Sequence, residues 1–239
     1  MLILAFETSA KAASVALHDG QKLLGESYQN TGLTHSQTLM VMAEDMLKAA
    51  GKTMADVTAV AVAEGPGSFT GVRIGVAAAK GLAWGKELPC YGVSTLEAMA
   101  LSFGVYEGLV VPVMDARRNQ VYTATFLAKD GKLERLCEDR AISLEELGNE
   151  LKNVTQRIFL VGDGSIVCYN ALEETVPNLV LPPEHRMHQQ AAGVALAAQK
   201  QIDAGLPGDG AQLNPNYLRL SQAERERQEK ESREKEKKI

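Results

Sequence analysis

The sequence has little of what marks secreted, disulfide-bonded or membrane-spanning proteins. It holds only three cysteines, at positions 90, 137 and 168, far apart and without a Cys-x-x-Cys spacing. An odd, scattered set of this kind predicts free thiols in a reducing compartment. No signal peptide is visible at the N-terminus, and no apolar run approaches the roughly 20 residues that span a bilayer. We therefore expect a cytoplasmic protein without a membrane segment.

An excess of positive charge is also absent. The net charge is -5, and residues 1–220 alone carry 18 basic and 24 acidic residues, a balance of -6. This balance argues against a strongly basic nucleic-acid surface on this chain alone. The remaining segment, 221–239, has six acidic and seven basic residues and almost no apolar one. That composition predicts a charged, solvated tail that is frayed or disordered.

What the chain does have is enough apolar material for a core, since 45% of its residues are hydrophobic. The pattern of apolar residues predicts strands at 2–6, 14–17, 23–28, 57–63 and 90–93, with helices at 36–50, 69–84 and 94–103. It then predicts strands at 109–114, 121–127, 133–137 and 158–161, with helices at 143–151, 165–174 and 188–204. A capping box is expected at Thr34 and Gln37, and single caps at Ser68, Ser94 and Ser143.

The order of three strands, helix, strand and helix therefore occurs twice, although the residue identities do not repeat. This order predicts an α/β fold of two similar domains with a cleft between them. We expect the first domain at 1–104, completed by part of 188–220, the second at 105–187, and the charged tail at 221–239.

The predicted helix after residue 68 has small residues at every fourth position: Gly67, Gly71, Gly75, Ala79 and Ala83. Each glycine inside a helix costs about 1 kcal/mol relative to alanine, so a close approach of another backbone is the expected compensation. That backbone belongs either to this chain's own sheet or helices, or to another chain. For the second alternative, the methionine-rich helix at 36–50 is the expected neighbour.

The partner interface predicted on the second alternative comprises His35, Leu39, Met42, Met46, Gly71, Gly75 and Ala79. On this prediction, Gly75→Leu abolishes pairing and leaves a folded monomer. The loop at 65–68 opens the same helix, and free amide groups at a helix start can hold an anion. It lacks the Gly-Lys-Ser/Thr end of a Walker loop, so its spacing is weak evidence for a nucleotide.

Several short motifs together resemble the TsaB (YeaZ) family. They are FETS at 6–9, THS at 34–36, GPGSFTGVRIG at 65–75, GVSTL at 92–96, DAR at 115–117 and YLR at 217–219. The resemblance covers roughly 1–220, and the long glycine-rich run is its most specific part. It implies a ribonuclease-H-like duplicated fold of the actin/hexokinase/heat-shock-ATPase superfamily.

The resemblance also implies a role in forming N6-threonylcarbamoyladenosine next to the anticodon of tRNA. In this family the chain is a non-catalytic partner of a TsaD-like catalytic paralogue, joined by a TsaE-like ATPase. It meets tRNA through the complex and forms a homodimer when the partner is absent. It implies no cofactor on this chain by itself, with ATP or ADP at the interface of the complex as the alternative.

The resemblance also directs attention to a few single residues. The catalytic paralogue has a His-x-x-x-His metal motif, but here His35 is followed by Leu39, so we expect no metal site. Glu7, with Thr8 and Ser9, stands where ATPases of the superfamily contact phosphate, and Asp115 holds the corresponding place in the second half. These acids either hold a magnesium nucleotide, or Asp115 pairs locally with Arg117 or Arg118. The competing hypothesis is thus a cleft ATPase or kinase whose turnover is lost in Asp115→Asn.

Overall fold

The first half of the chain is a five-stranded sheet covered on both faces. The computed structural model describes residues 1–104 and 106–219. The strands are β1 (Ile3–Glu7), β2 (Ala13–His18), β3 (Leu23–Gln29), β4 (Ala59–Gly65) and β5 (Cys90–Ser94). They lie in the order β3-β2-β1-β4-β5, with β1 antiparallel to β2 and parallel to β4. β1 and β2 are buried along their whole length, as expected for strands with helices on both faces.

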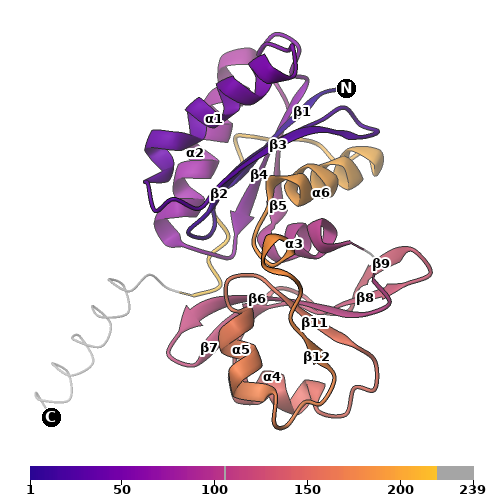
Figure 1. The fold of residues 1–239 in the computed structure, drawn as a ribbon. Coiled ribbons are helices and arrows are strands. Elements are labelled where there is room, and N and C mark those ends of the chain that lie inside the picture. The colour runs from indigo at the N-terminus through magenta and orange to yellow at the C-terminus, as the bar shows by residue number, and fades with distance from the viewer. Residues whose placement is uncertain (105, 220–239) are drawn as a thin grey trace, which may run out of the picture.

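Alternate residues of the central strands face different helices. The helices are α1 (His35–Ala49), α2 (Phe69–Lys86), α3 (Thr95–Phe103) and α6 (Ala191–Asp203). Leu4 and Phe6 of β1 join the core formed with α1 and α2, whereas Ile3 and Ala5 join the core formed with α3 and α6. Figure 1 shows α1 and α2 side by side on one face of this sheet, with α6 on the other.

The second half repeats the strand order of the first. Its strands are β6 (Gly108–Arg117), β7 (Gln120–Thr123), β8 (Phe126–Lys129), β9 (Lys132–Arg135), β10 (Arg140–Ser143), β11 (Ile158–Val161) and β12 (Leu179–Val180). The central path is β10-β7-β6-β11-β12, and β8 pairs with β6 and β9. Helices α4 (Leu144–Leu151) and α5 (Ser165–Leu172) and the short helix η1 (Glu184–Arg186) complete this half. The duplicated α/β arrangement predicted from the sequence is confirmed.

Two predicted strands of the second half are each divided in the structure. The strand predicted at 121–127 is β7 and β8, which continue one register along β6, with Val113 opposite Thr123 and Val110 opposite Phe126. Pro112 lies in β6 opposite the break, where it has no backbone N–H to donate. The strand predicted at 133–137 is β9, and β10 follows it as a strand that the pattern did not predict.

The helix starts agree with three of the four predicted caps. The Oγ atoms of Ser68, Ser94 and Ser143 accept hydrogen bonds from the amide N–H groups of Gly71, Glu97 and Glu146. The capping box predicted at Thr34 is wrong, because Thr34 occupies the N-cap position without a side-chain hydrogen bond. A capping box does form at Ser143, whose amide N–H donates to the Glu146 carboxylate. The last helix, α6, starts later than predicted.

A segment that we call the C-terminal strap, residues 205–219, joins the two halves. The Lys80 ammonium donates to the Leu213 carbonyl over 2.8 Å, and the Asn216 amide donates to the Glu64 carbonyl over 2.6 Å. At its end, Arg219 Nη1 donates to the carbonyl of Ala116 in the second half over 2.6 Å. Figure 1 shows this yellow segment running from α6 toward the β6–β7 end of the second sheet. The tail predicted at 221–239 lies outside the described residues.

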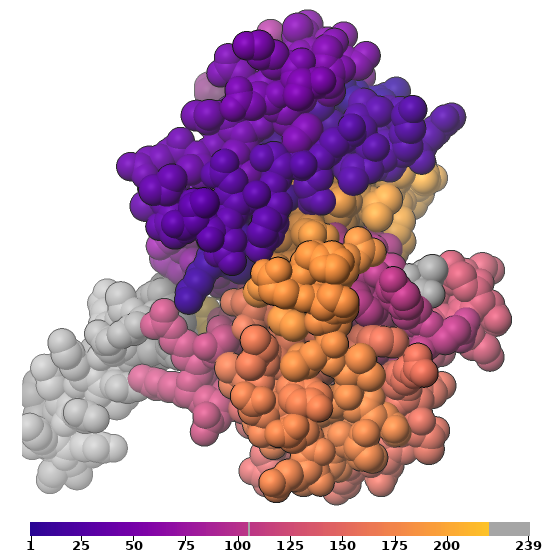
Figure 2. All heavy atoms as spheres, in the orientation of Figure 1, coloured from indigo at the N-terminus to yellow at the C-terminus, as the bar shows by residue number. Residues whose placement is uncertain are grey.

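In a space-filling view the two halves form separate lobes. Figure 2 shows orange atoms of the segment around η1 between the lobes on this face. None of the helices in the described part of the chain has the length and apolar character needed to cross a membrane.

Candidate functional site

The glycines of α2 bring this helix directly onto the end of β1. A Cβ added at Gly71 would lie 2.1 Å from the Thr8 carbonyl oxygen, and one added at Gly75 would lie 2.3 Å from Thr8 Oγ1. At the start of the helix, a Cβ at Gly67 would lie 2.5 Å from the Ser9 carbonyl oxygen. Thr8 Oγ1 donates to the Gly71 carbonyl over 2.8 Å and fixes the contact. The close approach required by these glycines is therefore within this chain.

This packing corrects most of the predicted interface. Buried in the core of this chain are Leu39, Met42, Gly71, Gly75 and Ala79. His35 is half-buried, with Nε2 donating to the Ala10 carbonyl over 2.8 Å. The expectation that Gly75→Leu leaves a folded monomer is wrong, because even a methyl group at Gly75 would overlap Thr8. The sequence could not show which side of α2 faces its own sheet.

The opposite side of the two helices is exposed and apolar. We define the α1–α2 face as Met40, Val41, Ala77, Gly81 and Trp84, all of which are exposed. Trp84 is the most exposed large hydrophobic side chain described, at 88%. A Cβ at Gly81 would meet nothing within 4 Å, so this side of α2 is free to receive a neighbour at short distance.

Beside this face lies a groove between α1 and β3. Its volume is about 320 Å³, and its lining residues include Ser27, Val41 and Asp45 together with the predicted Met42 and Met46. Met46 is half-buried, and its sulfur also packs against Gly25 of β3. Of the predicted interface residues, Met42 and Met46 therefore reach the border of this surface.

At the end of β1, Glu7 is buried without a full set of partners. Its Oε1 accepts the amide N–H of Ser9 over 2.6 Å, whereas its Oε2 has no hydrogen-bond partner among the described residues. Burial raises the pKa of Glu7 to about 7 against an ordinary value of 4.5, and the nearby negative charge of Asp163 adds to the shift. Glu7 is thus a candidate for a neutral carboxylic acid inside the fold.

The corresponding acid of the second half lies in different surroundings. Asp115 is exposed near the end of β6, and its Oδ1 accepts the amide N–H of Arg117 over 2.7 Å. Asp115 therefore has a local partner in the backbone of Arg117, while its predicted pairing with Arg117 or Arg118 stays a prediction. The turn that follows is strained, since Arg117, Arg118 and Asn119 have φ values of 63°, 56° and 56°. A left-handed backbone conformation costs each residue other than glycine on the order of 1 kcal/mol of stability.

The structure does not open the predicted nucleotide residues to a ligand. Glu7, Thr8 and Ser9 are each 0% exposed, and α2 and its glycine loop lie directly on Thr8 and Ser9. Asp115 alone is accessible. The hypothesis that these four residues contact a phosphate stays a prediction, and it requires the three buried residues to become accessible. Sequence reasoning missed Asp163, whose charge acts on Glu7 and whose Oδ1 accepts a hydrogen bond from Gln189 Nε2 over 2.9 Å.

A short internal repeat explains the position of Asp163. Gly65-Pro66-Gly67-Ser68 follows β4 and opens α2, and Gly162-Asp163-Gly164-Ser165 follows β11 and opens α5. Both second glycines approach the preceding central strand, since a Cβ at Gly164 would lie 3.0 Å from the Asp115 nitrogen. The prediction that residue identities do not repeat is therefore wrong at these two loops, and their shared Gly-x-Gly-Ser pattern was the available signal.

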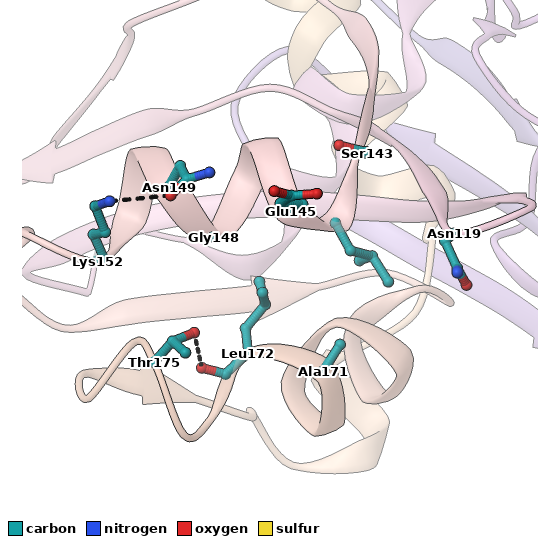
Figure 3. A pocket seen from close by; sticks show the side chains of 10 residues that line it. Asn119, Ser143, Glu145, Gly148, Asn149, Lys152, Ala171, Leu172 and Thr175 are labelled. Carbon is teal, nitrogen blue, oxygen red and sulfur yellow. Dashed lines mark hydrogen bonds between the residues drawn. The ribbon is translucent and has the colours of Figure 1, made fainter.

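A second groove lies between α4 and α5, away from every predicted site residue (Figure 3). Its volume is about 740 Å³. Leu172 packs against Gly148 at its base, and the Lys152 ammonium is bonded to Asn149 Oδ1 over 3.0 Å. The bonds given for its polar side chains are thus local ones, such as that of the Thr175 hydroxyl to the Leu172 carbonyl over 3.1 Å.

Metal and thiol chemistry find no support in the described residues. No group of three or more His, Cys, Asp or Glu side chains there is placed to hold a metal ion. The three cysteines are free, as predicted, and Cys90 and Cys168 are buried. Burial raises the pKa of the Cys90 thiol to about 11 and that of Cys168 to about 12, which makes both poor nucleophiles.

Comparison with known proteins places this geometry in a family. A family model described as TsaD, tRNA N6-adenosine threonylcarbamoyltransferase, matches residues 29–227. The chain is 32% identical over 225 residues to the tRNA threonylcarbamoyladenosine biosynthesis protein TsaB of Bacillus subtilis, covering 94% of this chain and 96% of that protein. It is 37% identical over 168 residues to TsaB of Escherichia coli, covering 69% and 72%.

The fold comparison agrees. The solved structure of YeaZ from Pseudomonas aeruginosa superposes with a TM-score of 0.72 at 26% identity, covering 91% of this chain and 99% of that one. The predicted class, an α/β fold of the actin/hexokinase/heat-shock-ATPase superfamily, is confirmed. The chain belongs to the TsaB (YeaZ) family of tRNA threonylcarbamoyladenosine biosynthesis proteins, which is related to the TsaD family.

Proposed function

We propose that this chain is a non-catalytic subunit required for threonylcarbamoyl transfer to the adenosine next to the anticodon of tRNA. It scaffolds a TsaD-like catalytic paralogue and a TsaE-like ATPase in the cytoplasm, and it forms a homodimer when alone. ATP or ADP belongs at the interface of that complex rather than to this chain by itself. Family membership supports the pathway, and the α1–α2 face supports the role as a partner.

The observation that carries the proposal is the division of α2 into two sides. Its inner side is fixed on Thr8 by Gly71 and Gly75, which explains those glycines within the monomer. Its outer side keeps Ala77, Gly81 and Trp84 in solvent. Exposed small residues beside a large aromatic allow the backbone of a second helix to come close while an anchoring side chain is covered.

The absence of catalytic geometry agrees with this role. Glu7, Thr8 and Ser9 have no accessible surface, and a metal grip of the His-x-x-x-His kind is broken by the buried Leu39. The competing cleft ATPase requires both acids at an open site, and only Asp115 is exposed.

The test is a bulky substitution on the outer side of α2. A Cβ at Gly81 has room in the monomer, so for Gly81→Leu we expect a midpoint of thermal unfolding no lower than that of the parent. We also expect a loss of at least tenfold in affinity for the TsaD-like paralogue. Isothermal titration calorimetry measures the affinity. Asn170→Leu, which adds the same side chain to an exposed position of α5, is the control and keeps the parent affinity.

A reconstituted modification assay tests the role itself. Threonylcarbamoylation of a tRNA transcript is measured with each protein omitted in turn, and omission of this chain is expected to abolish it. Modification by this chain alone, or ATP turnover by this chain that disappears in Asp115→Asn, contradicts the non-catalytic role. Unchanged partner affinity in Gly81→Leu contradicts the interface.

A further inference from the structure

The C-terminal strap brings arginine and aromatic side chains from both halves to one surface. The rings of Phe69 and Tyr217 stack with their centroids 4.9 Å apart. The guanidinium carbon of Arg73 lies 3.7 Å from the Phe69 centroid, and Arg73 Nε donates to the Tyr217 hydroxyl over 2.6 Å. Tyr217 remains 42% exposed, so one aromatic surface of this stack is open to a ligand.

Two more arginines continue this surface onto the second half. Arg219 is two residues beyond Tyr217, and its Nη1 is held by the Ala116 carbonyl over 2.6 Å. Arg117 follows Ala116 directly and is exposed on the β6–β7 turn. We define the arginine–tyrosine face as Phe69, Arg73, Arg117, Tyr217 and Arg219. Within it, Phe69, Arg73 and Tyr217 contact one another, and the bond from Arg219 to Ala116 brings the strap to the end of β6 where Arg117 lies.

Two guanidinium groups of this face, those of Arg73 and Arg219, are held by hydrogen bonds. Within the described residues, no carboxylate forms an ion pair with Arg73, Arg117 or Arg219, and the terminal nitrogens of Arg73 have no hydrogen-bond partner. Asp115, two residues before Arg117, has its Oδ1 engaged by the Arg117 amide. A guanidinium already ordered by stacking and by one hydrogen bond loses little further freedom when it binds a phosphate through its remaining donors.

We propose that the arginine–tyrosine face binds the phosphate backbone of tRNA, with Tyr217 stacking on an unpaired base. Arginine forks match phosphate oxygens bidentately, and aromatic side chains beside arginine are the usual platform for single-stranded RNA. An acidic protein would engage the same charges but would leave the exposed ring without a specific use. This inference rests on the proposed function, because that function makes tRNA the substrate of the complex, and it assigns part of the contact to this chain.

The test measures tRNA binding by the full chain, alone and with its TsaD-like partner. Fluorescence anisotropy of a labelled, unmodified tRNA transcript is recorded across a salt series for the parent and for Arg73→Gln/Arg117→Gln. We expect affinity to fall at least tenfold at low salt. The slope of log K against log salt is expected to become shallower by about one per arginine, since each phosphate contact releases counterions. Arg157→Gln is the control.

Arg157 is a matched control because it is exposed and lies at the opposite end of the same sheet, where its carbonyl accepts the Leu109 amide. The substitution Arg157→Gln removes one positive charge without changing the arginine–tyrosine face. The proposal is overturned if the double variant keeps the parent affinity and salt slope, or if Arg157→Gln changes them equally. It is also overturned if the double variant loses only its affinity for the TsaD-like protein, which indicates an acidic protein contact. If tRNA modification proceeds without this chain while the double variant still loses tRNA affinity, the proposed function is contradicted and the tRNA-binding face is not.

Discussion

The two halves of the molecule share one strand order but treat the end of their central strand in opposite ways. In the first half, β1 ends at Glu7, whose carboxylate is fully buried, and Thr8 and Ser9 after it lie against α2 and its glycine loop. In the second half, β6 runs on to the β6–β7 turn, and Asp115 is exposed. The corresponding helix of the second half, α5, has eight residues against 18 in α2.

This difference shows that two halves with the same strand order can differ in whether the end of the central strand is accessible to a ligand. A cleft enzyme needs both strand ends open to a common ligand. Here, glycines let one helix close the first strand end, and the same helix gains an outer side that is free for a partner. The burial of Thr8 and Ser9 and the exposure of the outer side of α2 therefore both belong to one packing arrangement.

The largest expected effect is the loss of stability when a side chain is added where α2 touches the residues after β1. Gly71→Ala places a methyl group 2.1 Å from the Thr8 carbonyl oxygen, and the buried strand cannot move away. We expect the free energy of unfolding to fall by about 3 kcal/mol, at the upper end of overpacking costs. Urea denaturation followed by circular dichroism measures it. Gly81→Ala, in open space on the same helix, is the control and stabilises by about 1 kcal/mol. Equal effects at both positions contradict the packing.

The second effect distinguishes the two acids by pH. Because the pKa of Glu7 in the folded protein is raised to about 7 from 4.5, the folded state holds a proton that the unfolded chain has released. Stability is therefore expected to fall as pH rises from 4.5 to 7, by about 3 kcal/mol in total. Glu7→Gln removes this loss, whereas Asp115→Asn serves as the control at the exposed strand end. The test is the free energy of unfolding measured across this pH range. If the parent and Glu7→Gln show the same pH dependence, the raised pKa of Glu7 is contradicted.

The smallest effect compares helix starts in the two halves. Ser143→Ala removes the hydroxyl that accepts the Glu146 amide N–H at the start of α4, whereas the bond from the residue 143 amide to the Glu146 carboxylate can remain. This loss is expected to cost about 1 kcal/mol. Thr34→Ala, at the start of α1, removes a side chain without a capping bond and is expected to have little effect. Thermal unfolding of both variants checks the difference. If Thr34→Ala loses more stability than Ser143→Ala, the predicted difference between the two helix starts is contradicted.

Much of the fold was predictable because local patterns and tertiary structure agree. The apolar runs at β1 and β4, the serine caps and the twice-repeated element order all appear where expected. The divided strand opposite Pro112 was not predicted, because the run of apolar residues continues across the break. The start of α6 was also placed too early, since η1 and the segment after it contain residues compatible with a helix.

The site was less predictable, for a geometric reason. A four-residue spacing identifies one side of α2 but does not show what that side faces. Gly71 and Gly75 face Thr8, a residue more than 60 positions earlier, and no local pattern reports that contact. The Gly-x-Gly-Ser repeat at 65–68 and 162–165 was readable from the sequence, and it would have drawn attention to Asp163.

The path of the chain has a consequence for synthesis. The core beneath the first sheet includes Val194 and Ala198 of α6, and the strap then returns to Glu64 and Ala116. A ribosome therefore releases every strand of the first sheet long before it releases the helix that covers one face of that sheet. The second sheet has all its strands and both of its helices before α6 emerges. We expect the second half to become protease-resistant first in a nascent chain, with the first half exposed until the strap is complete.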